Sequence, residues 1–144
     1  SEKAQDILHK VMNDKTLIQA NPYFYHFILD AIYKSGLFAE YGIETLRKWT
    51  DLVNECDKGL KEVWDGFDCD YSHAWGGTPA YQLPARLLGF EIIEPGMRKI
   101  SLKPDTYGLD YAKISMPTPY GKINVNINID GTYTLSVPEK ITVV

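Results

Sequence analysis

The sequence predicts an α+β protein, in which helices occupy the first part of the chain and an antiparallel sheet or sandwich follows. Apolar residues recur with helical spacing up to about Gly89, and beyond it they alternate with polar residues as in strands. With 144 residues, of which 44% are hydrophobic and 24% charged, the chain is long and apolar enough to bury a core. These observations exclude a disordered chain.

The clearest helix is expected to begin at Asn21-Pro22, because asparagine is a good N-cap and proline suits the first helical position. Gly36 is expected to end it. The polar residues of this segment form only a narrow stripe at four-residue spacing: His26, Asp30 and Lys34. We therefore expect most of this helix to be buried.

Three further helices are expected, one before Asn13, one over residues 39–53 and one from residue 75 or 78 to Leu88. The residues of the second that should share its buried side are Gly42, Leu46, Trp49 and Val53. Pro84 falls inside the third. Because proline lacks a backbone donor, we expect a kink or a late start there.

Strands are expected after Gly89. Residues 122–129, "KINVNINI", alternate without error and place four residues on one apolar face: Ile123, Val125, Ile127 and Ile129. Asp130-Gly131 then predicts a hairpin turn into "TYTLSV", where the apolar face would continue through Tyr133, Leu135 and Val137. The segments "MRKISLKP", "YAKISMP" and "KITVV" supply the remaining strands.

Composition argues against several kinds of partner and site. The net charge is -4 and no cluster of Lys and Arg occurs, so we expect no nucleic-acid partner. We expect no membrane partner either, because no apolar run is long enough to span a bilayer. Cys56 and Cys69 form no CxxC motif and are expected to be free thiols. Cys69, Asp70 and His73 lack a second pair of ligands, so we expect no metal ion and no cofactor.

The sequence shows no charged start followed by an apolar core and a cleavage site. Ser1 is not an initiator methionine, so this observation leaves the localisation open. We favour a periplasmic or secreted localisation of the protein over a cytoplasmic one.

Several motifs occur in a fixed order and at compatible spacings. They are "NPYFYHFILDAI", a glutamate about ten residues before "SHAWGGTPAYQL", and then "LLGFEIIEPGMRKISLKP" and "ISMPTPYGKI". Through them, nearly the whole chain resembles the carboxyl-terminal end of bacterial α-L-rhamnosidases, glycoside hydrolase family 78. The resemblance implies that residues 1–89 are the closing helices of a catalytic (α/α)6 barrel and that residues 90–144 form a carboxyl-terminal β-sandwich. The upstream part of that barrel would be a partner that this chain lacks.

The resemblance also implies a chemistry. Glycoside hydrolysis uses two carboxyl groups, and the inversion expected in this family separates them by about 6.5 to 9.5 Å to admit a water molecule. Glu62, in "LKEVWDGFDCDYSHAW", occupies the position that is similar to the general base of the family. Asp65 and Asp68 compete for this role, and Glu62 could also be a solvated residue beside Lys61. The general acid is expected upstream of this chain.

The same comparison implies three substrate-binding residues. His73 matches the histidine of the SHAW motif, which is expected to bond sugar hydroxyl groups. Trp64 and Trp75 could form apolar walls against the methyl face of a deoxy sugar. Either tryptophan could instead belong to the core, which we favour for Trp75. The Gly76-Gly77 pair either brings the backbone close to the sugar or allows the turn before Thr78 caps a helix, and the second explanation is simpler.

We therefore expect part of an inverting α-L-rhamnosidase that hydrolyses terminal α-L-rhamnose from glycosides or polysaccharides and that is inactive alone. The alternative is a carbohydrate-binding or structural accessory module of another (α/α)6 glycosidase. The residues of this chain do not fix the sugar, the linkage or the aglycone, because upstream loops would set them.

Overall fold

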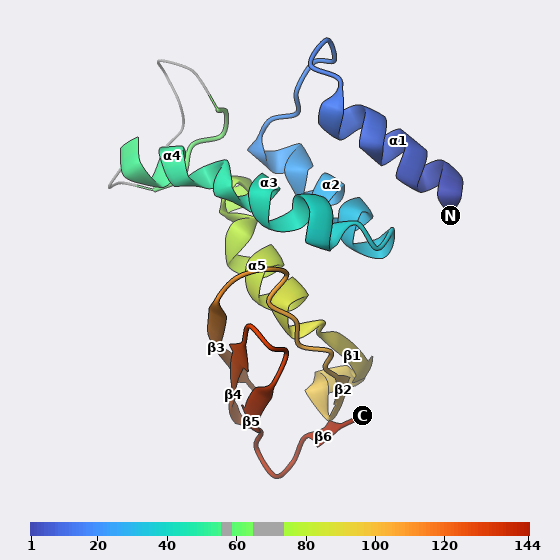
Figure 1. The fold of residues 1–144 in the computed structure, drawn as a ribbon. Coiled ribbons are helices and arrows are strands. Elements are labelled where there is room, and N and C mark those ends of the chain that lie inside the picture. Colours follow the sequence, from blue (N-terminus) through green and yellow to red (C-terminus); the bar gives the residue numbers. More distant parts are fainter. Residues whose placement is uncertain (56–58, 65–73) are drawn as a thin grey trace. The chain divides into compact units, whose positions relative to one another are not determined.

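Figure 1 shows the computed structural model, which describes residues 1–55, 59–64 and 74–144. The chain divides into two compact units, Ser1–Gln82 and Leu83–Val144, and the division falls within helix α5 (Pro79–Leu88). The first unit is helical and the second contains all the strands that the structure describes. The predicted α+β class is therefore confirmed.

Helices α1 (Glu2–Asn13) and α2 (Pro22–Lys34) form where the sequence predicts them. Asn21 is extended and precedes Pro22 at the first helical position. Gly36 has a positive φ of 76°, and its N–H bonds to the carbonyl of Tyr33. The next N–H, of Leu37, reaches back to the carbonyl of Ile32, so a glycine-centred turn ends α2 as predicted.

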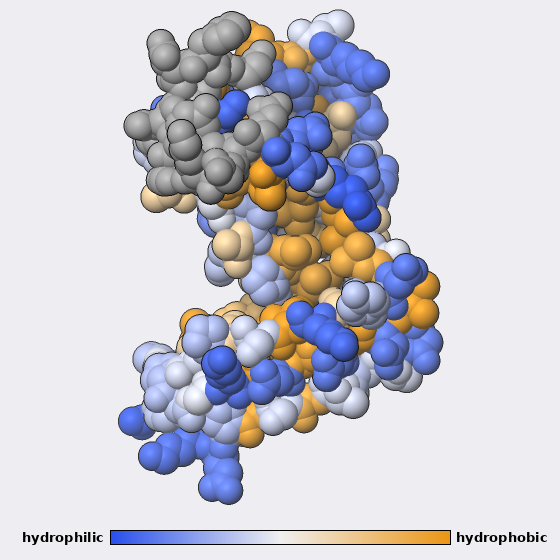
Figure 2. Space-filling model, turned by 90° about the vertical axis from the view of Figure 1, so that its left-hand side faces the viewer, coloured by the Kyte–Doolittle hydropathy of each residue, from blue (hydrophilic) through white to orange (hydrophobic). Residues whose placement is uncertain are grey.

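The prediction that α2 is mostly buried is wrong for this chain. One face is buried and contains Tyr25, Leu29 and Ile32. The other carries three aromatic side chains that are about half exposed, namely Tyr23, Phe24 and Phe27. On the face shown in Figure 2, hydrophobic side chains reach the surface among hydrophilic ones. Helix α2 is apolar around most of its circumference, but within residues 1–55, 59–64 and 74–144 only one of its sides is buried.

The helix predicted over residues 39–53 is broken into a π-helical turn (Phe38–Gly42), α3 (Ile43–Arg47) and α4 (Trp49–Glu55). At the break, the N–H of Lys48 bonds to the carbonyl of Thr45, only three residues back. This tighter turn shifts the buried side, so Leu52 is 2% exposed while Val53 is 59% exposed. Gly42, Leu46 and Trp49 are buried as predicted.

The core of the first unit contains a cluster of aromatic side chains. Tyr25, Trp49 and Leu52 form a buried cluster, and further residues pack against it: Ala20, Ile28, Leu60 and Trp64. A 3-10 turn (Ala74–Gly77) then leads into α5, which contains Pro84. None of the described helices has the length and apolar character that a membrane crossing requires.

The second unit contains two three-stranded sheets. One has the order β1 (Glu91–Glu94), β2 (Lys99–Ser101), β6 (Thr142–Val143), and a 3-10 turn (Pro95–Met97) joins its first two strands. The other has the order β3 (Tyr111–Thr118), β4 (Gly121–Asn128), β5 (Tyr133–Ser136). The second sheet is antiparallel throughout, but β2 and β6 pair in parallel, which corrects the prediction of purely antiparallel strands.

The alternation of "KINVNINI" is confirmed for its first three apolar residues, since Ile123, Val125 and Ile127 are at most 1% exposed. Ile129 is 66% exposed, which corrects the prediction for it. It lies beyond the end of β4, in the turn that Asp130-Gly131 makes. In β5, Tyr133 and Leu135 pair with the buried part of β4 but remain exposed themselves, because this strand is at the edge of its sheet.

Candidate functional site

A cavity of about 240 Å³ lies at the amino-terminal ends of α2 and α5. Its lining residues are Tyr23, His26, Ala74, Trp75, Gly77, Thr78 and Tyr81. The SHAW motif contributes its last two residues, Ala74 and Trp75, to this lining. The cavity therefore lies beside the segment that connects the SHAW motif to α5.

Aromatic rings form much of the cavity wall. The rings of Tyr23 and Trp75 lie with their centroids 4.7 Å apart, and those of His26 and Tyr81 lie 5.8 Å apart. Trp75 is 43% exposed, so it is not the core residue that we favoured, and it lines the cavity instead. Exposed aromatic faces beside polar groups suit the apolar C–H faces and hydroxyl groups of a sugar.

A polar network within the first unit holds the side chain of His26. Its Nδ1 lies 2.7 Å from the hydroxyl of Thr78. Gln82 is fully buried, and its amide nitrogen donates to Asp30 Oδ1 at 3.0 Å and to the backbone carbonyl of His26 at 3.1 Å. The same nitrogen lies 3.3 Å from His26 Nδ1. Two helices thus fix the position of this imidazole.

Glu62 lies in the segment 59–64. Contacts of Lys61 and Trp64 hold this segment in place on both sides of Glu62. Before it, the carbonyl oxygen of Lys61 lies so close to Gly76 that a β-carbon there would be 2.7 Å away. After it, the indole N–H of Trp64 donates to the carbonyl of Ala20 at 2.6 Å. Glu62 itself is half-buried. The position of the predicted base is thus coupled to the turn that lines the cavity.

Trp64 lies apart from the lining of the cavity. Its ring packs on Trp49, with centroids 4.7 Å apart, and on Tyr25, at 5.5 Å. In this chain Trp64 therefore belongs to the edge of the aromatic core. Its predicted role as a wall for the sugar stays a prediction.

Of the remaining predicted positions, several lie outside the described residues. These are His73, the competing carboxylates Asp65 and Asp68, and the thiols Cys56 and Cys69. Across residues 1–55, 59–64 and 74–144, no three side chains of His, Cys, Asp or Glu gather as a metal ion would require.

Tyr23, His26 and Tyr81 line the cavity but are not among the predicted site residues. The sequence predicts Tyr23 and His26 only as parts of a buried helix and its polar stripe. Tyr81 follows the SHAW motif by six residues, within the quoted motif "SHAWGGTPAYQL". The position of Tyr81 within the quoted motif was an available signal, whereas the approach of Tyr23 to Trp75 joins distant parts of the chain and has no local signal.

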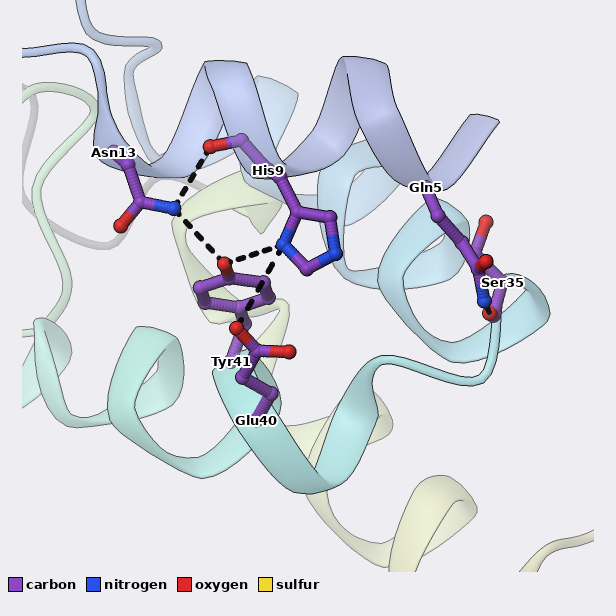
Figure 3. A network of polar contacts seen from close by, with 6 residues as sticks. All are labelled: Gln5, His9, Asn13, Ser35, Glu40 and Tyr41. Atoms are coloured by element: carbon purple, nitrogen blue, oxygen red, sulfur yellow. Dashed lines mark hydrogen bonds and ion pairs between the residues drawn. The ribbon is translucent and has the colours of Figure 1, made fainter. Parts of the chain in front are cut away.

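A second polar network, seen in Figure 3, attaches α1 to the π-helical turn. His9 Nδ1 and Asn13 Nδ2 lie 2.7 and 2.9 Å from the hydroxyl of Tyr41, and the Glu40 carboxylate lies 3.7 Å from His9. Glu40 raises the pKa of Tyr41 above its usual value. Because the contacts of Tyr41 and Glu40 in this network join α1 to the π-helical turn, we assign it a structural role.

Comparison with known proteins gives one family match to the later part of the chain and one structural match to nearly all of it. Residues 89–143 match the family model of the bacterial alpha-L-rhamnosidase C-terminal domain. The chain is also similar to the crystal structure of a GH78 family rhamnosidase of Bacillus sp. GL1, with 19% sequence identity and a TM-score of 0.76. That match covers 99% of this chain and 17% of the Bacillus chain. No curated protein matches the chain.

These findings confirm the resemblance to the carboxyl-terminal end of bacterial α-L-rhamnosidases. The structural match concerns the fold, and it extends over both units of the chain. The chain spans a small part, 17%, of the rhamnosidase that it resembles.

Proposed function

We propose that this chain is the carboxyl-terminal part of an inverting α-L-rhamnosidase, which removes terminal α-L-rhamnose from glycosides or polysaccharides. The observation that carries the proposal is the match of residues 89–143 to the rhamnosidase family model. The similarity of the fold to a GH78 rhamnosidase over 99% of the chain supports it.

In this proposal Glu62 is the general base. Its carboxylate takes a proton from the water that attacks the anomeric carbon, while a general acid outside this chain protonates the departing oxygen. The anchored segment 59–64 supports the assignment, because a base must be held within reach of the water that it activates. His73 is proposed to bind hydroxyl groups of the same sugar, with Trp75 as an apolar wall.

The chain is proposed to be inactive alone, because it lacks the general acid and most of the barrel. An apolar groove of about 800 Å³ supports this view, since it is lined by α1, the loop after it and α2. Among its lining residues, Ile18 is fully exposed and Phe24 and Phe27 are about half exposed. We propose that upstream helices of the barrel cover this groove in the parent enzyme.

The test is hydrolysis of an aryl α-L-rhamnoside by the full-length parent protein, followed by proton NMR of the released sugar. An inverting enzyme releases β-L-rhamnose first, and the α anomer appears later by mutarotation. Initial release of the α anomer would contradict inversion. Cleavage of other aryl glycosides without cleavage of the rhamnoside would favour another (α/α)6 glycosidase, and activity of residues 1–144 alone would refute their inactivity.

A further inference from the structure

We propose that His26 determines sugar affinity by donating a hydrogen bond from Nε2 to a hydroxyl group of a pyranose ring in the aromatic cavity. This inference rests on the proposed function, which supplies the sugar. It adds to that function a hydrogen bond between helix α2 and the sugar, made by a residue other than the proposed base Glu62 and the residues of the SHAW motif.

The first step is the orientation of the Gln82 amide. Its contacts at 3.0 and 3.1 Å are a carboxylate oxygen of Asp30 and the backbone carbonyl of His26. Both of these groups only accept hydrogen bonds, so the NH2 end of the amide must face them. The same NH2 group therefore also faces His26 Nδ1, which lies 3.3 Å away.

The second step is the tautomer of His26. Both N–H bonds of the Gln82 amide go to Asp30 and the carbonyl of His26, and the positive polarity of this NH2 group, 3.3 Å from Nδ1, disfavours a proton on that nitrogen. The hydroxyl of Thr78, 2.7 Å from Nδ1, can serve as a donor to the same nitrogen. The neutral imidazole is therefore expected to carry its proton on Nε2.

The third step is the place of Nε2. His26 lines the cavity together with the rings of Tyr23, Trp75 and Tyr81. Among residues 1–55, 59–64 and 74–144, the polar contacts of the His26 ring are made by Nδ1, so Nε2 keeps its donor for a ligand. The aromatic rings offer apolar faces, and the cavity of about 240 Å³ admits a single sugar ring rather than a long chain.

The experiment measures the affinity of the full-length protein for L-rhamnose by calorimetric titration. In His26→Asn the side-chain amide takes the place of Nδ1 and nothing replaces Nε2, so binding should weaken about tenfold. In His26→Gln the amide nitrogen reaches the place of Nε2, so affinity should stay within about threefold of the wild type. His9→Asn, which makes the same change outside the cavity, should leave the affinity unchanged.

Monodeoxy analogues of L-rhamnose identify the contact. The analogue that lacks the bonded hydroxyl should bind the wild type and His26→Asn equally, while the other analogues should keep the tenfold difference. A loss that is equal for every analogue, or an equal loss in His26→Asn and His26→Gln, would mean that His26 is structural and would overturn the inference. Unchanged affinity in His26→Asn would overturn it as well.

Failure of the inference is distinguishable from failure of the proposed function. Wild-type protein that cleaves aryl rhamnosides and binds L-rhamnose, without any effect of His26→Asn, would contradict only the role of His26. Wild-type protein that neither cleaves rhamnosides nor binds L-rhamnose would contradict the proposed function, and the inference would be wrong with it.

Discussion

The backbone carbonyl of Lys61 lies directly against Gly76, so that a β-carbon at Gly76 would be 2.7 Å from this oxygen. Gly77, the next residue, has no atom within 4 Å of the place that its β-carbon would take. Both glycines belong to the turn beside the cavity, but only Gly76 permits a close approach of two backbone segments. The glycine pair, for which the sequence left two explanations open, therefore contains one residue required for packing.

Gly76→Ala should displace Lys61 and with it Glu62, whereas Gly77→Ala is the matched control. Because small displacements of a catalytic group are costly, we expect kcat for an aryl rhamnoside to fall up to about a hundredfold in Gly76→Ala. Gly77→Ala should keep kcat within about twofold of the wild type, and because Gly77 lines the cavity, any effect of its methyl group on the sugar should appear in KM. Equal activity of the two variants in steady-state assays of the full-length protein would show that this contact does not position the base.

Thr45 is a site where substitution should stabilise the protein. It is 1% exposed, and its hydroxyl oxygen has no hydrogen-bond partner in the part of the chain that the structure describes. Valine has the same shape without the hydroxyl, so Thr45→Val should raise the free energy of unfolding by about 1 kcal/mol. The increase should appear as a higher Tm in calorimetry. The exposed Thr50→Val serves as control, and a lower Tm for Thr45→Val would reveal a partner of the hydroxyl.

The hairpin turn at Asp130 should contribute a pH-dependent part of stability. The hydroxyl and N–H of Thr132 donate to Asp130 at 2.7 and 2.9 Å, and they hold the pKa of this carboxyl below its usual 3.8. A depressed folded pKa means that the stabilisation is present above the usual value and is lost as the pH falls through the folded pKa.

The Tm of Asp130→Asn should therefore fall less between pH 7 and about pH 2 than the Tm of the wild type. Asp110→Asn removes the same charge from the same unit and should keep the wild-type difference. An identical pH dependence of the wild type and Asp130→Asn would show that the Thr132 contacts contribute no measurable stability.

The isolated chain of 144 residues should self-associate. Phe24 and Phe27 are 57% and 48% exposed and line the apolar groove of the first unit, and large exposed apolar surfaces promote contact. The double variant Phe24→Ser and Phe27→Ser should lower the apparent mass in light scattering, while Ile93→Ser in the second unit should not. A monomer at high concentration in the unsubstituted chain would contradict this prediction.

Features set by neighbouring residues could be predicted from the sequence. The start of α2 at Pro22, the end at Gly36 and the buried face of β4 each depend on a few residues that determine their own backbone conformation, although the Asn21 side chain makes no capping hydrogen bond. The break at Lys48 could not be predicted in this way. There the packing of Trp49 and Leu52 in an aromatic core overrides a regular helical period.

The site was only partly predictable for the same reason. The contact between His26 and Gln82 joins residues 56 positions apart, and no local pattern specifies it. The exposure of Trp75 depends on which neighbours the chain contains, so residue type alone suggested the core. The structure places Ala74 and Trp75 of the quoted SHAW motif at the cavity, although the core was favoured for Trp75 and Ala74 had no predicted role.

The most direct test of the central claim compares Glu62→Gln and Asp65→Asn in the full-length protein, with an aryl α-L-rhamnoside as substrate. If Glu62 is the general base, Glu62→Gln should lose about a thousandfold in kcat with little change in KM, because a neutral amide takes up no proton from water. Asp65→Asn should then retain most of the activity. Full activity of Glu62→Gln, with the large loss in Asp65→Asn instead, would contradict the account and assign the base to Asp65.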